Sequence, residues 1–206
     1  VYDADGADGD DFRTVGGDYY KPTDADYEAN CDEARQLLAD AGYPNGEGFP
    51  VVEYLYNTSD AHKAVAEALQ FMWEEELGVK VTLNNQEWAA FLQTRKDGDY
   101  SIARNGWIAD YNDPISFLDM WMTGGGNNDA QYANDDYDAL IKQAKTTTDN
   151  AERMDLLHQA EDKLIGEDNV LAPLYFYTQK YMLADGIEGM YYCPLGYFFF
   201  GYTHQA

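Results

Sequence analysis

Residues 103–114, with the sequence ARNGWIADYNDP, place one carboxylate between two large aromatic side chains. Asp110 follows Trp107 by three positions and directly precedes Tyr111. A carboxylate in such a setting can cap a turn, form half of an acid/base pair, bind a metal ion, or accept a charge-assisted hydrogen bond from an ammonium group with help from the ring faces. The function of the protein depends on which of these four chemistries Asp110 performs.

Motifs for nucleophilic or acid/base catalysis are absent from the sequence. The histidines stand outside any G-x-S-x-G or H-E-x-x-H pattern, and they are His62, His158 and His204. A glycoside hydrolase needs two carboxylates that flank one bond, and Asp110 with Asp113 is the pair that this segment offers. Asp113 precedes a proline, however, which is typical of a turn residue. We expect that the protein is not an enzyme, and we keep a carboxylate-pair glycoside hydrolase as the alternative from another functional class.

Metal and cofactor motifs are equally weak. Cys31 and Cys193 fit no metal-binding spacing, and the sequence leaves open whether they pair or remain two buried thiols. The acidic start DADGADGDD fails the EF-hand register, because Ala7 stands at the fifth position and Asp8 at the sixth. The oxygen-rich stretch 127–136 is typical of loop and cap residues. We therefore expect no metal site and no cofactor.

The charge of the chain excludes further classes of partner. Its 206 residues include 38 acidic and 13 basic ones, which gives a formal net charge of −25. Nucleic acids and anionic membrane surfaces attract clustered Lys and Arg, so we expect neither as a partner. No apolar run reaches the length that spans a bilayer. The 18 tyrosines, 9 phenylalanines and 4 tryptophans can serve a core or a recognition surface.

Hydrophobic periodicity predicts alternating strands and helices before Asp110. The expected elements are a helix over 30–41 capped by Asn30, a strand over 51–57, a helix that begins at Thr58 or Ser59 and ends at Gly78, a strand over 79–83 and a helix over 86–96. On the last of these helices Trp88 and Arg95 are seven residues apart, so they project from nearly the same side.

A strand over 100–109 is expected to lead up to Asp110. Period-two alternation would place Arg104, Gly106 and Ile108 on one face and Trp107 on the other. A glycine such as Gly106 inside a strand often marks close approach by another backbone or a ligand. Beyond it we expect helical turns over 115–122, helices over 135–147 and 150–165, and a strand over 170–179 in which Pro173 favours an edge. This alternation argues for an α/β or α+β fold.

A series of motifs in this order resembles the oligopeptide- and dipeptide-binding proteins of bacterial ABC importers, which are extracellular solute-binding proteins. The series consists of YNTSD followed by His62, then NNQEW, TR and ARNGWIADYN, and the similarity is strongest over residues 54–118. It continues more loosely through AERMDLLHQAEDKLI and VLAPLYFYTQ, so it covers most of the chain beyond residue 20. The resemblance implies an α/β lobe of the type II periplasmic-binding-protein kind, with a mixed sheet flanked by helices.

The resemblance also implies a role for each matching position. Asp110, which Trp107 flanks, falls where the family's aspartate holds the α-ammonium group of a peptide. Gly106 and Ile108 fall in the segment whose backbone pairs with the peptide main chain. Other matches line side-chain pockets, meet a peptide carboxylate or lie at the cleft, and they are Trp88, Arg95, Arg104, Asn57 and His62. One family branch has a disulfide-bonded cysteine at the position of Ile108, so that disulfide is absent here.

The family's proteins are longer and close two lobes around the ligand, so this chain is expected to supply most of the second lobe. We expect an acidic segment over 1–20, an α/β domain over 21–185 and an aromatic tail over 186–206 that returns toward the first lobe. The implied function is peptide binding for the membrane permease of an ABC importer, in the periplasm or at the cell surface as a lipoprotein. A sugar, an opine or a metal chelate on the same scaffold is the alternative ligand.

Overall fold

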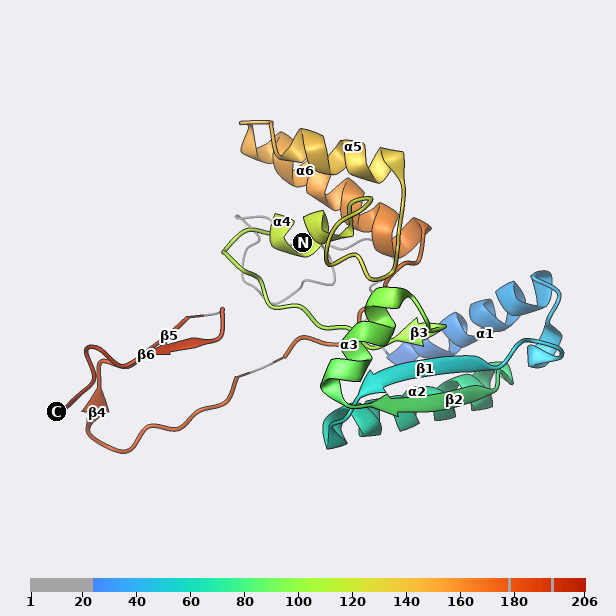
Figure 1. The fold of residues 1–206 in the computed structure, drawn as a ribbon, viewed down its shortest axis with the longest axis horizontal. Helices are drawn as coiled ribbons and strands as arrows, with labels where there is room; N and C mark the ends of the chain where they lie inside the picture. The colour runs from blue at the N-terminus through green and yellow to red at the C-terminus, as the bar shows by residue number, and fades with distance from the viewer. Residues whose placement is uncertain (1–23, 178, 194) are drawn as a thin grey trace.

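The computed structural model describes residues 24–177, 179–193 and 195–206. The expected acidic segment over 1–20, including the DADGADGDD stretch, lies outside the described residues. In the described chain the fold has an α/β part, a helical part and two short antiparallel ladders near the C-terminus (Figure 1). Two connecting segments, 104–114 and 168–186, link these parts. The first of them carries Asp110 and the predicted site residues from Arg104 to Ile108.

The α/β part is built on a parallel sheet. Its elements are α1 (Asp24–Asp40), η2 (Pro44–Gly46), β1 (Val52–Asn57), α2 (Asp60–Leu77), β2 (Val81–Gln86), α3 (Trp88–Asp97) and β3 (Ile102–Ala103). The strand order is β2-β1-β3, and β1 pairs in parallel with both of its neighbours. The expected mixed sheet is therefore wrong for this part of the described chain, since both pairings are parallel. Helices α2 and α3 connect successive strands, which is the kind of crossover that parallel pairing requires.

Alternating residues of β1 bury side chains on both faces of this sheet. Tyr54 and Tyr56 lie in one apolar cluster with Leu38 of α1 and with Leu69 and Trp73 of α2, and Figure 1 shows α2 running along β1 and β2. Because successive side chains of a strand point to opposite faces, Leu55 faces the other way, where α3 contacts β1. The sheet is therefore covered on both faces, as parallel sheets usually are.

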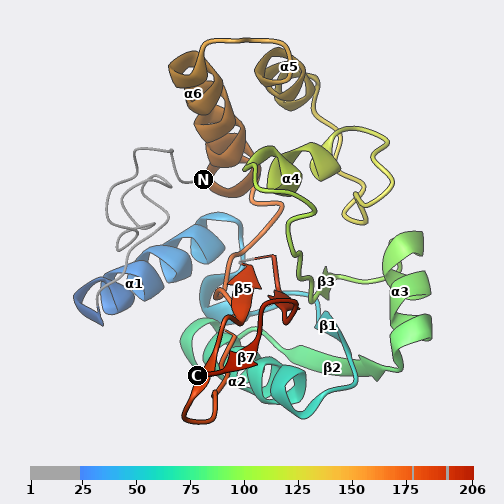
Figure 2. The ribbon, with the colours of Figure 1, turned by 90° about the vertical axis from the view of Figure 1, so that its left-hand side faces the viewer.

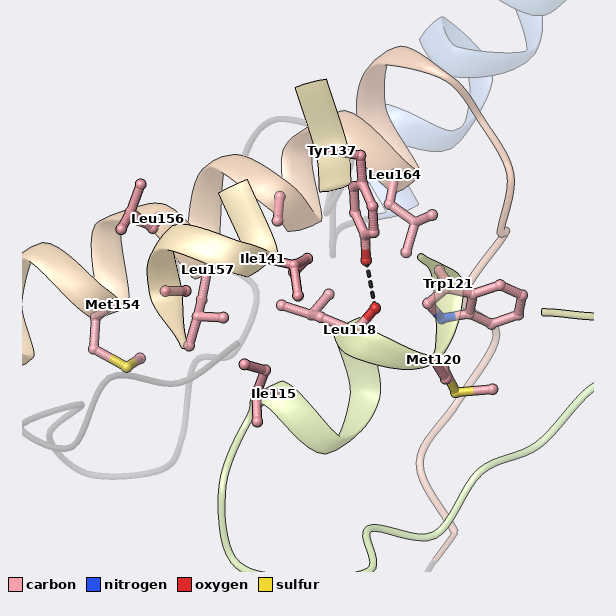
Figure 3. Close-up of a cluster of buried hydrophobic side chains, with 12 residues drawn as sticks. Ile115, Leu118, Met120, Trp121, Tyr137, Ile141, Met154, Leu156, Leu157 and Leu164 are labelled. Carbon is pink, nitrogen blue, oxygen red and sulfur yellow. Dashed lines mark hydrogen bonds between the residues drawn. The ribbon is translucent and has the colours of Figure 1, made fainter. Parts of the chain in front are cut away.

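The helical part contains the larger buried cluster. Its elements are α4 (Ile115–Leu118), η3 (Asp119–Trp121), α5 (Asp135–Ala144), α6 (Asn150–Glu161) and η4 (Asp162–Glu167). Asn134 and Asp149 cap α5 and α6 with side-chain oxygens. Figure 3 shows Tyr137 and Ile141 of α5 packed against the α4 turn, where the Tyr137 hydroxyl donates to the carbonyl of Leu118 at 2.7 Å. This cluster holds the far end of the segment that carries Asp110.

The C-terminal residues form two small ladders. Strand β4 (Ile187–Glu188) pairs antiparallel with β7 (His204–Gln205), and β5 (Tyr191–Cys193) pairs antiparallel with β6 (Tyr197–Phe199). Figures 1 and 2 show that the second connecting segment passes the sheet on its way from α6 to these ladders. Cys193 and Cys31 are both free, half-buried thiols, so the alternative of a disulfide between them is wrong. Among the described residues, no helix is both long and apolar enough to cross a bilayer.

Two expected strands differ from the structure. In place of a strand over 100–109, only Ile102–Ala103 pairs with β1, and the amide of Arg104 donates the next bond to the carbonyl of Leu55 at 2.8 Å. The chain then leaves the sheet toward α4, so the period-two faces expected for residues 104–109 do not apply. Residues 170–177 and 179 form no strand, because four consecutive side chains from Leu174 to Tyr177 are exposed and no described strand lies beside them.

Helix boundaries differ in smaller ways. Helix α1 is already formed at Asp24, so Asn30 lies inside it and is not its cap. Ser59 occupies the cap position of α2 without a side-chain capping bond, while the Thr58 hydroxyl donates to Asn85 of β2. Gly78 ends α2 as expected. Helix α5 ends at Ala144, three residues before the expected end.

Candidate functional site

Asp110 lies at a bend between the sheet and α4, with its side chain exposed. Its backbone amide donates to the hydroxyl of the buried Ser116 at 3.0 Å, which fixes the bend to the helical part. Within the described part of the chain, the Asp110 carboxylate has no ion pair and no hydrogen bond. The structure therefore leaves this anion available to a ligand.

Asp113, by contrast, has structural partners. One of its carboxylate oxygens, Oδ1, accepts from the amide of Ile115 at 2.9 Å and from the guanidinium of Arg153 at 2.7 Å. Burial acts to raise the pKa of the Asp113 carboxyl, but the bonds from Arg153 and Ile115 outweigh it and hold that pKa below its usual range. Asp113 thus anchors the turn to α6, and this role disfavours it as the second acid of a hydrolase pair.

Residues 104–110, which we call the recognition segment, leave the main chain open at Ile108. Ile108 is 68% exposed, and its N–H and C=O have no backbone partner among the described residues. Trp107 turns the other way and packs against the buried cluster of the helical part. Its indole N–H is buried and has no hydrogen-bond partner among the described residues. The segment is therefore anchored through Trp107 and open along its other side.

Asn57, His62 and Arg104 meet at the carboxyl edge of the sheet, where α/β proteins commonly bind ligands. Asn57 ends β1, His62 lies in the first turn of α2, and Arg104 follows β3. The Arg104 guanidinium donates to the Asn57 side chain at 3.3 Å, and the His62 Nδ1 lies 3.2 Å from the Asn57 carbonyl. Asn57 and His62 are thus brought together with Arg104, which lies 47 positions from Asn57 in the sequence.

Tyr177 completes this group, although the sequence did not single it out. Its hydroxyl lies 2.9 Å from an Arg104 nitrogen and 3.4 Å from His62 Nε2. The pKa of Tyr177 is lowered by the hydrogen bond from Tyr175 and by the bond and charge of Arg104, although burial acts to raise it. The sequence signal for Tyr177 was the aromatic run LYFY at residues 174–177, and its residue pattern predicts a strand rather than a ligand site.

Trp88 and Arg95 project from the same side of α3, as expected, with Phe91 between them. The Trp88 ring stacks on Phe91 with centroids 5.8 Å apart, and the Arg95 guanidinium lies 5.2 Å from the same ring. Trp88 is 53% exposed. Arg95 instead turns inward to Asp129, at 2.7 Å, and contacts the recognition segment only through Asn105 and the Arg104 carbonyl.

No metal centre is formed by the described residues. They contain no group of three or more His, Cys, Asp or Glu side chains that could hold an ion. In the oxygen-rich stretch 127–136, Asn128 donates to the carbonyls of Trp121, Met122 and Tyr132, and Asn134 caps α5. These oxygen and amide groups therefore have structural partners.

Comparisons with known proteins show which proteins the chain resembles. The model of the family described as "Bacterial extracellular solute-binding proteins, family 5 Middle" matches residues 1–129. The dipeptide-binding protein DppE of Bacillus subtilis is 39% identical over 191 residues, which are 92% of this chain and 34% of that protein. The probable deoxycholate-binding periplasmic protein YgiS of Escherichia coli is 38% identical over 156 residues, 76% of this chain and 29% of its own length.

A solved structure extends the similarity to three dimensions. The crystal structure of Haemophilus influenzae OppA in complex with the peptide RPPGFSPFR superposes with a TM-score of 0.70 at 33% identity, covering 78% of this chain and 31% of that one. The expected fold class, a type II periplasmic-binding-protein α/β architecture, is confirmed by this likeness. The chain spans about a third of the length of the curated relative DppE.

Proposed function

Because this chain belongs to family 5 of the bacterial extracellular solute-binding proteins, we propose that it binds peptides as part of the substrate-binding subunit of an ABC importer. The observation that carries the proposal is the free, exposed carboxylate of Asp110 at the end of a segment whose main chain is open at Ile108. An ammonium group is the natural partner of such an anion. The protein would act outside the cytoplasm and deliver its peptide to a membrane permease, without catalysis.

The proposed binding mode combines main-chain pairing with recognition of the peptide terminus. A peptide lying along residues 106–108 would exchange backbone hydrogen bonds with the N–H and C=O of Ile108, as a strand does when it adds to an edge, while the Gly106 N–H keeps its bond to Asn105. Its α-ammonium group would then reach Asp110. Neither contact depends on peptide side chains, so the site would accept many sequences. Arg104, held by Asn57 and Tyr177, supplies the guanidinium that a peptide carboxylate can meet.

The test is the dependence of binding on the peptide amine. Trialanine with a free amine and its N-acetylated form are titrated against the chain and against Asp110→Asn by saturation-transfer NMR. We expect a Kd on the order of 1 mM for the free-amine form, because Asp110 is exposed and exposed ion pairs contribute only about 0.2–1 kcal/mol. The substitution should weaken binding of the free-amine peptide by about fivefold at most and leave binding of the acetylated peptide unchanged.

Asp60→Asn is the matched control, because it removes the same charge from an exposed position in the first turn of α2. It should leave the affinity for both peptides unchanged. Equal losses with Asp110→Asn and Asp60→Asn would show a general effect of net charge and would contradict the role of Asp110. Low-micromolar binding by the chain would contradict the expected weakness.

A second candidate ligand class is suggested by the relative named for deoxycholate binding. Deoxycholate carries a carboxylate and no amine, so its binding would involve Arg104 and be insensitive to Asp110. Titration with deoxycholate therefore separates the two proposals. Saturation by deoxycholate that survives Asp110→Asn, together with no response to trialanine, would favour this second candidate.

A further inference from the structure

Arg95 is a largely enclosed cation beside the recognition segment. Its side chain is 14% exposed, and Nε donates to the Asp129 carboxylate at 2.7 Å. Nη1 donates to the Asn105 side chain at 2.9 Å and to the Arg104 carbonyl at 3.4 Å, and the ring of Phe91 lies under the guanidinium. A ligand carboxylate could bind Arg95 strongly only by displacing these partners.

Asp129 is held in place independently of Arg95. The Tyr100 hydroxyl donates to the Asp129 carbonyl at 2.9 Å, and the Gln131 amide donates to the carbonyl of Asp97. Gln131 also packs against Gly98 at the end of α3, so closely that a Cβ there would overlap its amide. The Asp129 carboxylate is itself 14% exposed. This loop therefore delivers a fixed counter-charge to Arg95.

Asn105 transmits this arrangement to the main chain of the recognition segment. Its Oδ1 accepts at once from Arg95 and from the amide of Gly106, the latter at 2.8 Å. One chain of contacts thus runs from Asp129 through Arg95 and Asn105 to Gly106. Because linked hydrogen bonds support one another, loss of the Arg95 bond should also loosen the contact to Gly106.

We propose that Arg95 is a positioning residue, and that Asp129 and Asn105 complete a clamp that holds residues 104–106 in place. Arg95 then does not contact the ligand, which leaves Arg104 as the guanidinium on the ligand side. The proposal rests on the proposed function of the recognition segment as a peptide site. Under this proposal Asp129 and Asn105 do not contact the ligand, and they affect its affinity only by holding residues 104–106 in place.

The clamp is tested first in the free, ¹⁵N-labelled chain by hydrogen exchange in NMR. Asp129→Ala should speed exchange of the Arg95 Nε–H by at least tenfold, as expected for loss of a bond to a charged group. The Gly106 amide should speed up by about fivefold. Asp129→Asn repeats the test if the alanine variant does not fold.

Glu76→Gln is the control, because it removes the charge from another carboxylate paired with an arginine at 2.7 Å, here Arg35 between α1 and α2. It should change neither exchange rate. Unchanged exchange at Arg95 in a folded Asp129 variant overturns the clamp.

The second arm asks whether Arg95 contacts the ligand. Alanine peptides of two to six residues, each as free acid and as C-terminal amide, are titrated against Arg95→Gln. A positioning role predicts the same factor of loss for acid and amide at every length. A larger loss for the acid at any length would show that Arg95 binds the carboxylate and would overturn the proposal. If no peptide binds the unsubstituted chain, the proposed function fails, while the exchange experiment still decides the clamp.

Discussion

Gly78 offers a stringent test of the packing that supports the site. It ends α2 with φ 66°, and its amide donates to the carbonyls of Glu74 and Trp73. A Cβ added to Gly78 would overlap the carbonyl oxygen of Asn45 in the turn between α1 and β1. The position of a Cβ is fixed by its own backbone, and the Asn45 carbonyl is part of the backbone, so neither atom can rotate away. Gly78→Ala must therefore separate the end of α2 from this turn.

The cost has two parts that a matched variant separates. The left-handed backbone conformation costs a residue with a Cβ about 1–2 kcal/mol, and an overpacked contact costs about 1–3 kcal/mol more. Gly48 has φ 78° but open space around the position of a Cβ, so Gly48→Ala carries the first part alone. We expect Gly78→Ala to lower the free energy of unfolding by about 2–5 kcal/mol and Gly48→Ala by about 1–2 kcal/mol.

Urea denaturation followed by far-UV circular dichroism measures both values. The slope of the unfolding free energy against urea should be the same for the two variants, so that a shift in midpoint reports stability. Losses that agree within about 0.5 kcal/mol, the size of ordinary surface effects, would refute the reasoning, because they would show that the backbone contact with Asn45 carries no cost.

Two further substitutions test the helical part. Tyr137→Phe leaves the Leu118 carbonyl without its buried partner and should lower the free energy of unfolding by about 1–3 kcal/mol in urea denaturation; an unchanged midpoint would contradict this. Asp113→Asn should cost about 1 kcal/mol at pH 7, since the pair with Arg153 is partly exposed. Because the folded-state pKa of Asp113 is lowered, its contribution exists above the unfolded pKa and disappears as pH falls through the folded pKa. Denaturation at successively lower pH should therefore narrow the stability difference between the two proteins once the pH is below the unfolded pKa, and a difference that does not shrink with falling pH would count against the ion pair.

Local signals predicted the α/β part well. Glycine at position 78 marks the end of α2, and the alternation around residues 52–57 and 81–83 gives the two long strands. The prediction of a strand over 100–109 was wrong beyond Ala103, and the local residue pattern could not have indicated this. The pairing of β3 ends where the chain must turn toward α4, and that turn is imposed by the burial of Trp107 and Ser116 in the helical part.

The candidate site was predictable in part. Asp110 and Gly106 stood out by residue type and position, and the resemblance named Asn57, His62 and Arg104, which lie together in the structure. Tyr177 and Asp129 were missed, because they reach the site across 73 and 34 residues of sequence. Arg95 shows the same limit: its place on the Trp88 side of α3 follows from helical spacing, while its burial against Asp129 depends on the distant loop.

The central claim is that the recognition segment is a peptide site, and a residue-resolved map of binding tests it most directly. Trialanine with a free amine is titrated into the ¹⁵N-labelled chain, and the amide shifts are followed by two-dimensional NMR. We predict saturable shifts concentrated at Gly106, Ile108 and Asp110, with smaller ones at Asn57 and His62. Shifts that cluster on α5 and α6 while residues 104–110 stay unchanged would contradict the claim, as would the absence of any saturable shift.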